Sequence, residues 1–204
     1  MAEVIDSSAL VEGETIFRGD AAVEKMEALL GVKFNEVQKS IIRLEGYSTV
    51  PYYATEAEKD AGIVTIGAGQ TGKIKDNQFT GFANMSFSEA FNTLKKELID
   101  YIPDYKKYPV AVQKALMSAM YRGDLQKAPT TRRLINEGKF QEASQHFLLK
   151  GNPKFEADGS STDWSKDYKK ALANPDTLGG VITRLEGVSS ALKDYGVAKD
   201  FFKR

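Results

Sequence analysis

The feature that most constrains this chain is a change of residue pattern between Pro51 and Gly69. Two short runs rich in β-branched and aromatic residues, PYYA and IVTIGAG, stand on either side of the polar stretch TEAEKDAG. Runs of this kind joined by a polar turn predict a β-hairpin. A third short strand is expected near residues 78–82. The chain is therefore predicted to form a small sheet near its front.

Apolar residues at helical spacing surround this hairpin. Before it, Asn35 and Gln38 stand at the spacing of a capping box, and the helix that they open is predicted to end at Gly46, with Glu45 on its last turn. Asp20 is expected to cap an earlier helix. After the hairpin, helices are predicted to begin with a capping box of Ser86 and Glu89, to begin at Pro109, and to cover residues 130–137, 139–149 and 177–193.

The order of these elements predicts an α+β fold, with a small β lobe, a mostly helical lobe and a cleft between them. The first residues, up to about position 19, are polar and irregular and predict a tail or docking arm. We therefore divide the chain into an N-terminal extension, residues 1–35, and a main domain, residues 36–204. The aromatic residues of the helix after Ser86 are predicted to be core: Phe87, Phe91 and Tyr101.

Charge and cysteine content exclude several classes of function. The chain has 28 Lys and Arg residues against 28 Asp and Glu residues, so no overall field attracts nucleic acid or an anionic membrane. It has no cysteine, which excludes thiol catalysis, disulfides and thiolate metal sites. Its only histidine, His146, excludes any site with two histidine ligands and is expected to be partly exposed. We expect no metal and no cofactor.

The beginning of the sequence predicts neither a signal peptide nor membrane insertion. It has no cationic segment followed by an apolar run. No stretch approaches the roughly 20 apolar residues that are needed to span a bilayer. We therefore expect a protein that is made in a cytoplasm, does not insert stably into a membrane, and depends on another release route for any action outside the cell. We also expect a monomer.

The hairpin region resembles the active-site region of the phage-type lysozymes. In that family a helix ends in Glu-Gly, a tyrosine-bearing strand follows, and a turn leads into a Thr-Ile-Gly-x-Gly strand. The corresponding residues here are Glu45 and Gly46, Tyr52 and Tyr53, and residues 65–69. Later segments are similar to the family's central helix, helix pair and closing helix, in that order: QKALMSAMYRG, TTRRLINEGKFQEASQHFL and GGVITRLEG. The resemblance covers roughly residues 36–196.

The resemblance implies a muramidase, which cleaves the β-1,4 bond between N-acetylmuramic acid and N-acetylglucosamine in peptidoglycan. Hydrolysis of such a bond needs a carboxylic acid that protonates the leaving oxygen and, in most families, a second carboxylate. A glutamate at a helix C-terminus lies at the negative end of the helix dipole, which favours its proton-donating form. Glu45 holds this position and is the predicted acid.

The second carboxylate is where this chain departs from the family. The family aspartate stands nine residues after the glutamate and six before the threonine, and here those positions are Ala54 and Lys59. The interval between Glu45 and Thr65 is longer than usual, so the hairpin turn is predicted to carry an insertion.

Three acidic residues of the turn can replace the missing aspartate: Glu56, Glu58 and Asp60. We favour Asp60, because Asp60-Ala61-Gly62 resembles the family's Asp-x-x-Gly with one residue fewer, and it leads into the strand that holds Thr65. Two alternatives stay open. All three charges can be solvated turn residues, or the second carboxylate can come from outside the hairpin turn, from Asp76 or Asp124.

The resemblance implies roles for four further residues. Thr65 is expected to hold the attacking water through its hydroxyl group. Gln70 stands where the family usually has histidine, and it can form hydrogen bonds but cannot titrate. Tyr121 and Arg122, at the end of the central helix, are expected to line the cleft and bind sugar rings and carboxylates. Glu45, Asp60 and Thr65 are thus the predicted catalytic set, and Gln70, Tyr121 and Arg122 the predicted substrate-binding set.

The leading interpretation is an endo-acting muramidase that lyses bacterial cell walls. Its expected partner is peptidoglycan, reached after holin-dependent release or as part of a virion. The alternative is a lysozyme-fold module that binds cell wall or a partner protein with little or no catalysis. Ala54 and Lys59 favour this module, whereas Glu45 and Thr65 favour the enzyme.

Overall fold

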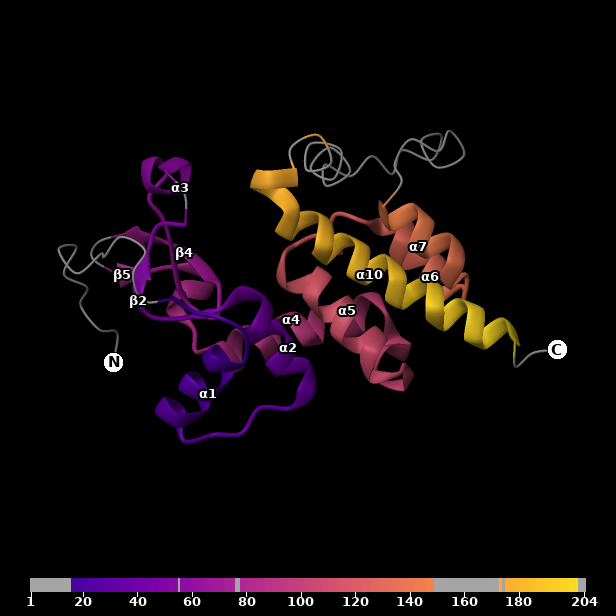
Figure 1. Cartoon of the computed structure of the whole chain (residues 1–204), viewed down its shortest axis with the longest axis horizontal. Coiled ribbons are helices and arrows are strands. Elements are labelled where there is room, and N and C mark those ends of the chain that lie inside the picture. The colour runs from indigo at the N-terminus through magenta and orange to yellow at the C-terminus, as the bar shows by residue number, and fades with distance from the viewer. Residues whose placement is uncertain (1–15, 55, 76–77, 149–172, 174, 202–204) are drawn as a thin grey trace. The chain divides into compact units, whose positions relative to one another are not determined.

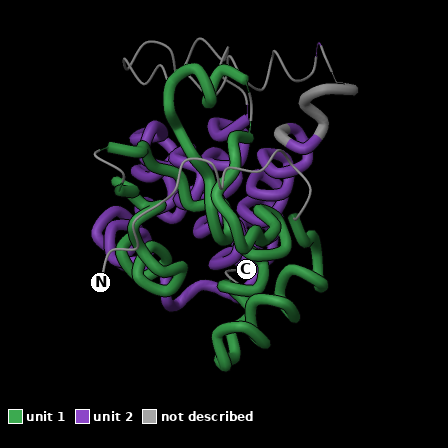
Figure 2. The backbone as a smooth tube through the Cα atoms, turned by 90° about the vertical axis from the view of Figure 1, so that its left-hand side faces the viewer, with its two compact units in different colours: residues 1–93 green, residues 94–204 purple. Residues whose placement is uncertain are grey.

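The predicted α+β class is confirmed. Helices and five antiparallel strands occur in the part of the chain that the structure, a computed structural model, describes (Figure 1). Contacts within the chain divide it into two compact units, which we call unit 1 (Met1–Thr93) and unit 2 (Leu94–Arg204) (Figure 2). The described residues are 16–54, 56–75, 78–148, 173 and 175–201.

Unit 1 contains the sheet, in which each strand pairs with the next along the chain. The predicted hairpin is confirmed, although its first strand begins and ends earlier than the PYYA run. The residue pattern does not predict the first strand, which lies in the expected arm, or the fourth. The strands are β1 (Ile16–Phe17), β2 (Tyr47–Tyr52), β3 (Ile63–Gly67), β4 (Gln70–Lys75) and β5 (Gln78–Phe79).

The turn of the hairpin contains a short helix, α3 (Glu56–Asp60), which fills most of the TEAEKDAG stretch. None of its residues is buried. Gly62 follows with a φ of 63°, and the chain then enters β3. The insertion that the sequence predicts in this turn is therefore helical.

Two helices precede β2 in unit 1, α1 (Gly19–Leu30) and α2 (Glu36–Glu45). The predicted capping box at the start of α2 is confirmed. The Asn35 side chain accepts hydrogen bonds of 3.0 Å from the backbone N–H groups of Val37 and Gln38, and the Gln38 side chain accepts one of 3.0 Å from the Asn35 N–H. Local hydrogen bonding thus fixes where α2 begins.

The predicted extension contributes directly to unit 1. Strand β1 pairs with β2, and α1 packs against α2. Asp20 does not cap α1, because Arg18 is the N-cap residue and the Asp20 carboxylate pairs instead with Arg43 Nε at 2.7 Å. The division of the chain into an N-terminal extension, residues 1–35, and a main domain, residues 36–204, stays a prediction.

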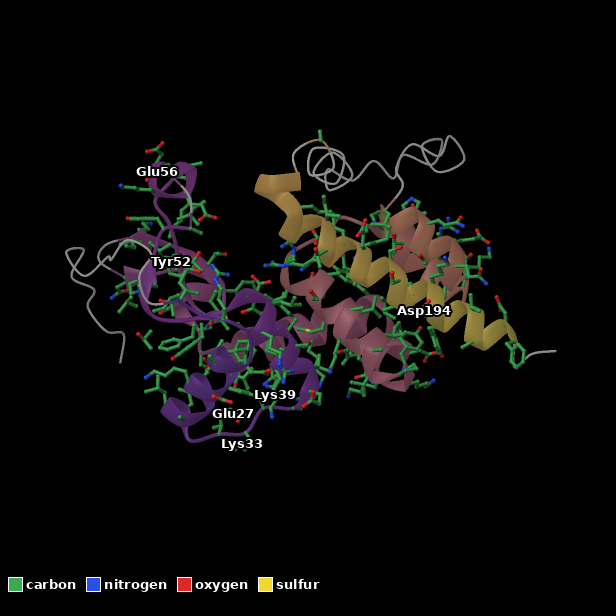
Figure 3. The ribbon with its side chains drawn as sticks, in the orientation of Figure 1. Glu27, Lys33, Lys39, Tyr52, Glu56 and Asp194 are labelled. Atoms are coloured by element: carbon green, nitrogen blue, oxygen red, sulfur yellow. The ribbon has the colours of Figure 1, made fainter. Side chains whose placement is uncertain are left out.

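A buried glutamate stabilises the connection between α1 and α2. The Glu27 side chain is 8% exposed, and its carboxylate accepts hydrogen bonds from Lys33 Nζ at 2.7 Å and from the Phe34 N–H at 2.9 Å. Lys39 Nζ lies 3.5 Å from the same carboxylate (Figure 3). The Lys33 hydrogen bond, followed by the Phe34 N–H and the two lysine charges, lowers the pKa of Glu27 to about 2.

Helix α4 (Phe87–Tyr101) contains the boundary between the units, and its predicted capping box of Ser86 and Glu89 is confirmed. In unit 2, helix α10 packs along α7 and α5 (Figure 1). The described elements of unit 2 that follow α4 are η3 (Pro103–Lys107), a 3-10 helix, and the helices α5 (Val110–Tyr121), α6 (Pro129–Asn136), α7 (Phe140–Leu148) and α10 (Pro175–Phe201).

The histidine is fully buried, so the expectation of a partly exposed side chain is wrong. His146 lies on α7, and its Nδ1 forms a hydrogen bond of 2.9 Å with Thr131 Oγ1 on α6. Its helix, α7, packs against both α6 and α10. The residue pattern around His146 does not indicate this packing. Of the predicted aromatic core, Phe87 and Phe91 are buried and Tyr101 is half-buried. No described helix is long and apolar enough to cross a membrane.

Candidate active site

Glu45, the predicted acid, is the last residue of α2 and is half-buried. Gly46 follows with a φ of 79°, a conformation that strains any residue with a side chain. A Cβ atom on Gly46 would lie 2.8 Å from the carbonyl oxygen of Phe17 and 3.0 Å from Ile16 Cγ2. Strand β1 therefore passes directly over Gly46, and only glycine fits there.

The turn between β3 and β4 also lies close to Glu45. A Cβ atom on Gly69 would lie 3.0 Å from Glu45 Cβ and 3.2 Å from Glu45 Oε2. Gly69 has a φ of 79°, which again favours glycine. The structure thus brings together two segments that are distant in sequence, the Glu-Gly helix end and the second glycine of the Thr-Ile-Gly-x-Gly segment.

Several charged groups of this region act electrostatically on Tyr52, a tyrosine of β2. Tyr52 pairs directly with Thr65 on β3, so the two side chains lie on the same face of the sheet. Thr65 is 4% exposed, and Tyr52 is half-buried. Burial raises the pKa of Tyr52, the Arg18 guanidinium lowers it, and the carboxylates of Glu45 and Glu58 raise it. We call these five residues, Arg18, Glu45, Tyr52, Glu58 and Thr65, the Tyr52 cluster.

The three acids of the hairpin turn differ in their surroundings. Glu58 is half-buried, and its Oε2 accepts a hydrogen bond of 3.1 Å from the Ala54 N–H. Glu56 is 82% exposed, at the outer end of α3 (Figure 3), and its carboxylate lies 3.8 Å from Lys59 Nζ. Asp60, the acid favoured from the sequence, is exposed at the end of α3. The backbone of Ala54, at the family's aspartate position, thus binds the carboxylate of Glu58.

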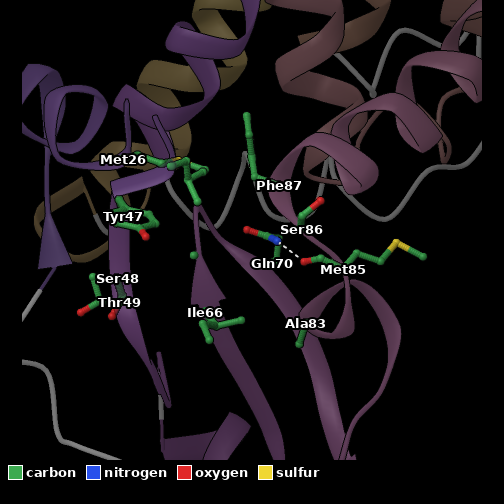
Figure 4. A pocket seen from close by; sticks show the side chains of 12 residues that line it. Met26, Tyr47, Ser48, Thr49, Ile66, Gln70, Ala83, Met85, Ser86 and Phe87 are labelled. Carbon is green, nitrogen blue, oxygen red and sulfur yellow. Dashed lines mark hydrogen bonds between the residues drawn. The ribbon is translucent and has the colours of Figure 1, made fainter. Parts of the chain in front are cut away.

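Gln70 is buried, and its amide group is bound to the backbone. Its Oε1 accepts a hydrogen bond of 3.0 Å from the Ala68 N–H, and its Nε2 donates one of 2.7 Å to the Met85 carbonyl (Figure 4). The side chain therefore ties the β3–β4 turn to the segment before α4. These contacts give Gln70 a structural role, and its role in binding substrate stays a prediction.

Tyr121 and Arg122 lie at the end of α5 and are half-buried. Arg122 Nε donates a hydrogen bond of 3.2 Å to Asp124 Oδ2. All three residues belong to unit 2, whereas the Tyr52 cluster belongs to unit 1. A role for Tyr121 and Arg122 in binding substrate therefore stays a prediction. Asp76, an alternative second carboxylate, lies outside the described residues.

Unit 1 also contains a pocket of about 210 Å³ (Figure 4). Ile66 lines it, and because side chains alternate along a strand, Ile66 points to the face opposite that of Thr65. No member of the Tyr52 cluster lines the pocket, whereas Gln70, from the predicted substrate-binding set, does. Its other walls include Met26, Leu30, Tyr47, Met85 and Phe87.

Arg18 is the member of the Tyr52 cluster that the sequence does not reveal. It follows β1 in the predicted extension. Because β1 pairs with β2, Arg18 lies beside Gly46, the residue that follows Glu45. A Cβ atom on Gly46 would lie 3.8 Å from Arg18 Cγ. Only a strand prediction for Ile16 and Phe17 would have indicated this position. A strand of two residues is too short for its alternation to be recognised.

No group of three His, Cys, Asp or Glu residues in the described part of the chain is placed to hold a metal ion. No family model, no curated protein and no solved structure matches the chain. What the site can do is therefore argued from its own residues. A half-buried carboxyl group at a helix end, a second carboxylate and a buried hydroxyl group suit proton transfer and water activation.

Proposed function

We propose that this protein is a peptidoglycan hydrolase of the phage-lysozyme type, a muramidase that cleaves the β-1,4 bond between N-acetylmuramic acid and N-acetylglucosamine. The observation that carries the proposal is the close approach of Gly69 to Glu45, which leaves no room for a side chain at position 69. The sequence resemblance links their two segments only by order along the chain, and in the structure they are neighbours. The proposed partner is bacterial peptidoglycan, reached by holin-dependent release or as part of a virion.

Glu45 is the general acid in this proposal, and it protonates the glycosidic oxygen as the bond to the sugar carbon breaks. The close approach of Gly69 restricts the Glu45 side chain, and a catalytic group gains rate when its position is fixed before the reaction. Thr65, buried on the face that carries Tyr52, holds the attacking water with its hydroxyl group.

A second candidate function is a lysozyme-fold module that binds cell wall without efficient catalysis. Ala54 and Lys59 support it, because they stand at the two positions where the family aspartate is expected. Such a module would sediment with intact cell wall and release no fragments from it.

Digestion of purified peptidoglycan, with the products identified by mass spectrometry, tests the proposed function. We expect fragments with new reducing ends at N-acetylmuramic acid from the wild type. Free peptide termini would instead show an amidase or a peptidase, and anhydro-muramic ends would show a lytic transglycosylase. Binding to cell wall with no cleavage would favour the binding module.

A further inference from the structure

We propose that Glu58, rather than Asp60, is the second carboxylate of the active site and accepts the proton of the attacking water. This inference rests on the proposed muramidase function. It comes from the position of the Glu58 side chain, which is bound to the backbone beyond the strand that carries Tyr52.

The Glu58 side chain of helix α3 lies beside the end of β2. The hydrogen bond of 3.1 Å from the Ala54 N–H to Glu58 Oε2 holds this carboxylate close to Tyr52, which is the last residue of β2. A group that receives a proton in a defined geometry needs such a restraint on its orientation. The insertion in the hairpin turn therefore both lengthens the turn and supplies a carboxylate.

The same tyrosine relates Glu58 to the acid. The charges of both Glu45 and Glu58 raise the pKa of the Tyr52 hydroxyl group. Tyr52 pairs with Thr65, whose hydroxyl group lies on the same face of the sheet. The proposed second carboxylate and the water-holding hydroxyl thus lie at the paired ends of β2 and β3.

The other two acids of the turn lack these features. Glu56 is 82% exposed, and its carboxylate lies 3.8 Å from Lys59 Nζ. Asp60 is exposed. Solvated charges of this kind contribute little to stability or chemistry. Among the three acids, Glu58 is the half-buried one.

The reaction balances with two proton transfers. Glu45 gives its proton to the glycosidic oxygen while the bond between that oxygen and the sugar carbon C1 breaks. The water held by Thr65 forms the new bond to C1, and its proton passes to Glu58. Exchange with solvent then returns a proton to Glu45 and removes one from Glu58, so no further reactant is needed.

Cleavage of a soluble peptidoglycan fragment by Glu58→Gln tests the inference. Glutamine keeps an oxygen that can accept the Ala54 N–H, so α3 is expected to stay in place and the melting temperature to stay unchanged. We expect kcat to fall about 10²–10⁴-fold, as for loss of a general base, with little change in KM. Glu56→Gln is the matched control, because it makes the same substitution on the same helix, and it is expected to keep the wild-type rate.

Azide distinguishes a catalytic role from a structural one. Glu58→Ala leaves space for azide, which attacks C1 without a base, so azide is expected to restore part of the rate and to form a glycosyl azide. The inference is overturned by a wild-type rate for Glu58→Gln, by loss of rate in Asp60→Asn alone, or by a slow Glu58→Ala that azide does not accelerate. In these cases the wild type still cleaves the glycosidic bond, whereas a wild type that cleaves none overturns the proposed function and this inference together.

Discussion

In unit 1, the surroundings of Glu27 differ from those of the two glutamates of the Tyr52 cluster, Glu45 and Glu58. Between α1 and α2, the Glu27 carboxylate accepts hydrogen bonds from Lys33 Nζ and from the Phe34 N–H, and a second lysine lies 3.5 Å away. In the Tyr52 cluster, by contrast, Glu45 packs against the backbone of a glycine and acts on the same tyrosine as Glu58.

The difference separates a structural carboxylate from candidate catalytic ones. A carboxylate surrounded by donors stays ionised, which stabilises the fold but leaves no proton to give at neutral pH. A carboxyl group fixed by backbone contact near a second carboxylate is suited to exchange protons with a bound molecule. Substitutions in the two regions are therefore expected to affect different properties of the protein.

The largest effect is expected for Glu45→Gln. Glutamine keeps the size and hydrogen bonding of the side chain but removes the transferable proton, so the cleavage rate is expected to fall about 10²–10⁴-fold. The melting temperature is expected to stay close to that of the wild type, because a neutral amide removes an unfavourable interaction with the helix dipole. Turnover and thermal unfolding are measured on the same sample. A variant that both melts and cleaves like the wild type would return Glu45 to an ordinary helix-end residue.

Gly69→Ala is expected to have the next largest effect. The new Cβ atom would lie 3.0 Å from Glu45 Cβ and would displace the acid. A displacement of about 1 Å can cost about 10²-fold in rate. The rate at saturating substrate is the measurement.

Gly62→Ala is the matched control in the same hairpin. Gly62 has a φ of 63°, but a Cβ atom there would have no neighbour within 4 Å. It is expected to carry only the backbone strain, roughly 1–2 kcal/mol of stability, and to keep its rate. An equal loss of rate in both variants would show that strain, and not contact with Glu45, causes it.

Glu27→Gln is expected to affect stability and to leave the rate of the folded protein unchanged. Because the fold lowers the pKa of Glu27 from 4.5 to about 2, its ionised form stabilises the protein above pH 4.5. This contribution is lost as the pH falls from 4.5 toward 2. Denaturant unfolding across this range is expected to show a lower free energy of unfolding for the variant at neutral pH and a weaker dependence on acid. Parallel pH curves for the two proteins would contradict the role of Glu27.

The smallest effect is expected for Asp20→Asn. The Asp20 side chain is 76% exposed and that of its partner Arg43 is 38% exposed, at a distance of 2.7 Å. An exposed pair of this kind contributes roughly 0.2–1 kcal/mol, and salt screens it. The free energy of unfolding is measured at low and high salt. A loss larger than that of Glu27→Gln would contradict the distinction between exposed and donor-surrounded carboxylates.

The helices and the position of Glu45 at a helix end could be predicted from the sequence because their signals are local. Asn35 with Gln38, and Ser86 with Glu89, form their capping hydrogen bonds within a few residues, so residue spacing alone reveals them. The position of Glu45 before Gly46 likewise follows from the end of one helix.

The remaining features depend on residues that are distant in sequence. Strand β1 forms because β2 lies beside it, and its two residues carry no recognisable alternation. Glu58 and Asp60 are both acidic residues of the hairpin turn, and the sequence gives no reason to expect different exposure. On α3 the Glu58 side chain is half-buried and the Asp60 side chain is exposed. His146 is buried because α6 and α10 contact its helix. Such differences in exposure arise from packing and cannot be predicted from spacing.

The most direct test of the Tyr52 cluster is a crystal structure of Glu45→Gln with an oligosaccharide that alternates N-acetylmuramic acid and N-acetylglucosamine. The slow variant is expected to hold this chain intact. We predict that a glycosidic oxygen lies within hydrogen-bond distance of the substituted side chain, roughly 3 Å, with a water bound to Thr65 on the other side of the sugar. An oligosaccharide bound away from position 45, for example in the pocket lined by Ile66, would contradict the assignment of Glu45 as the acid.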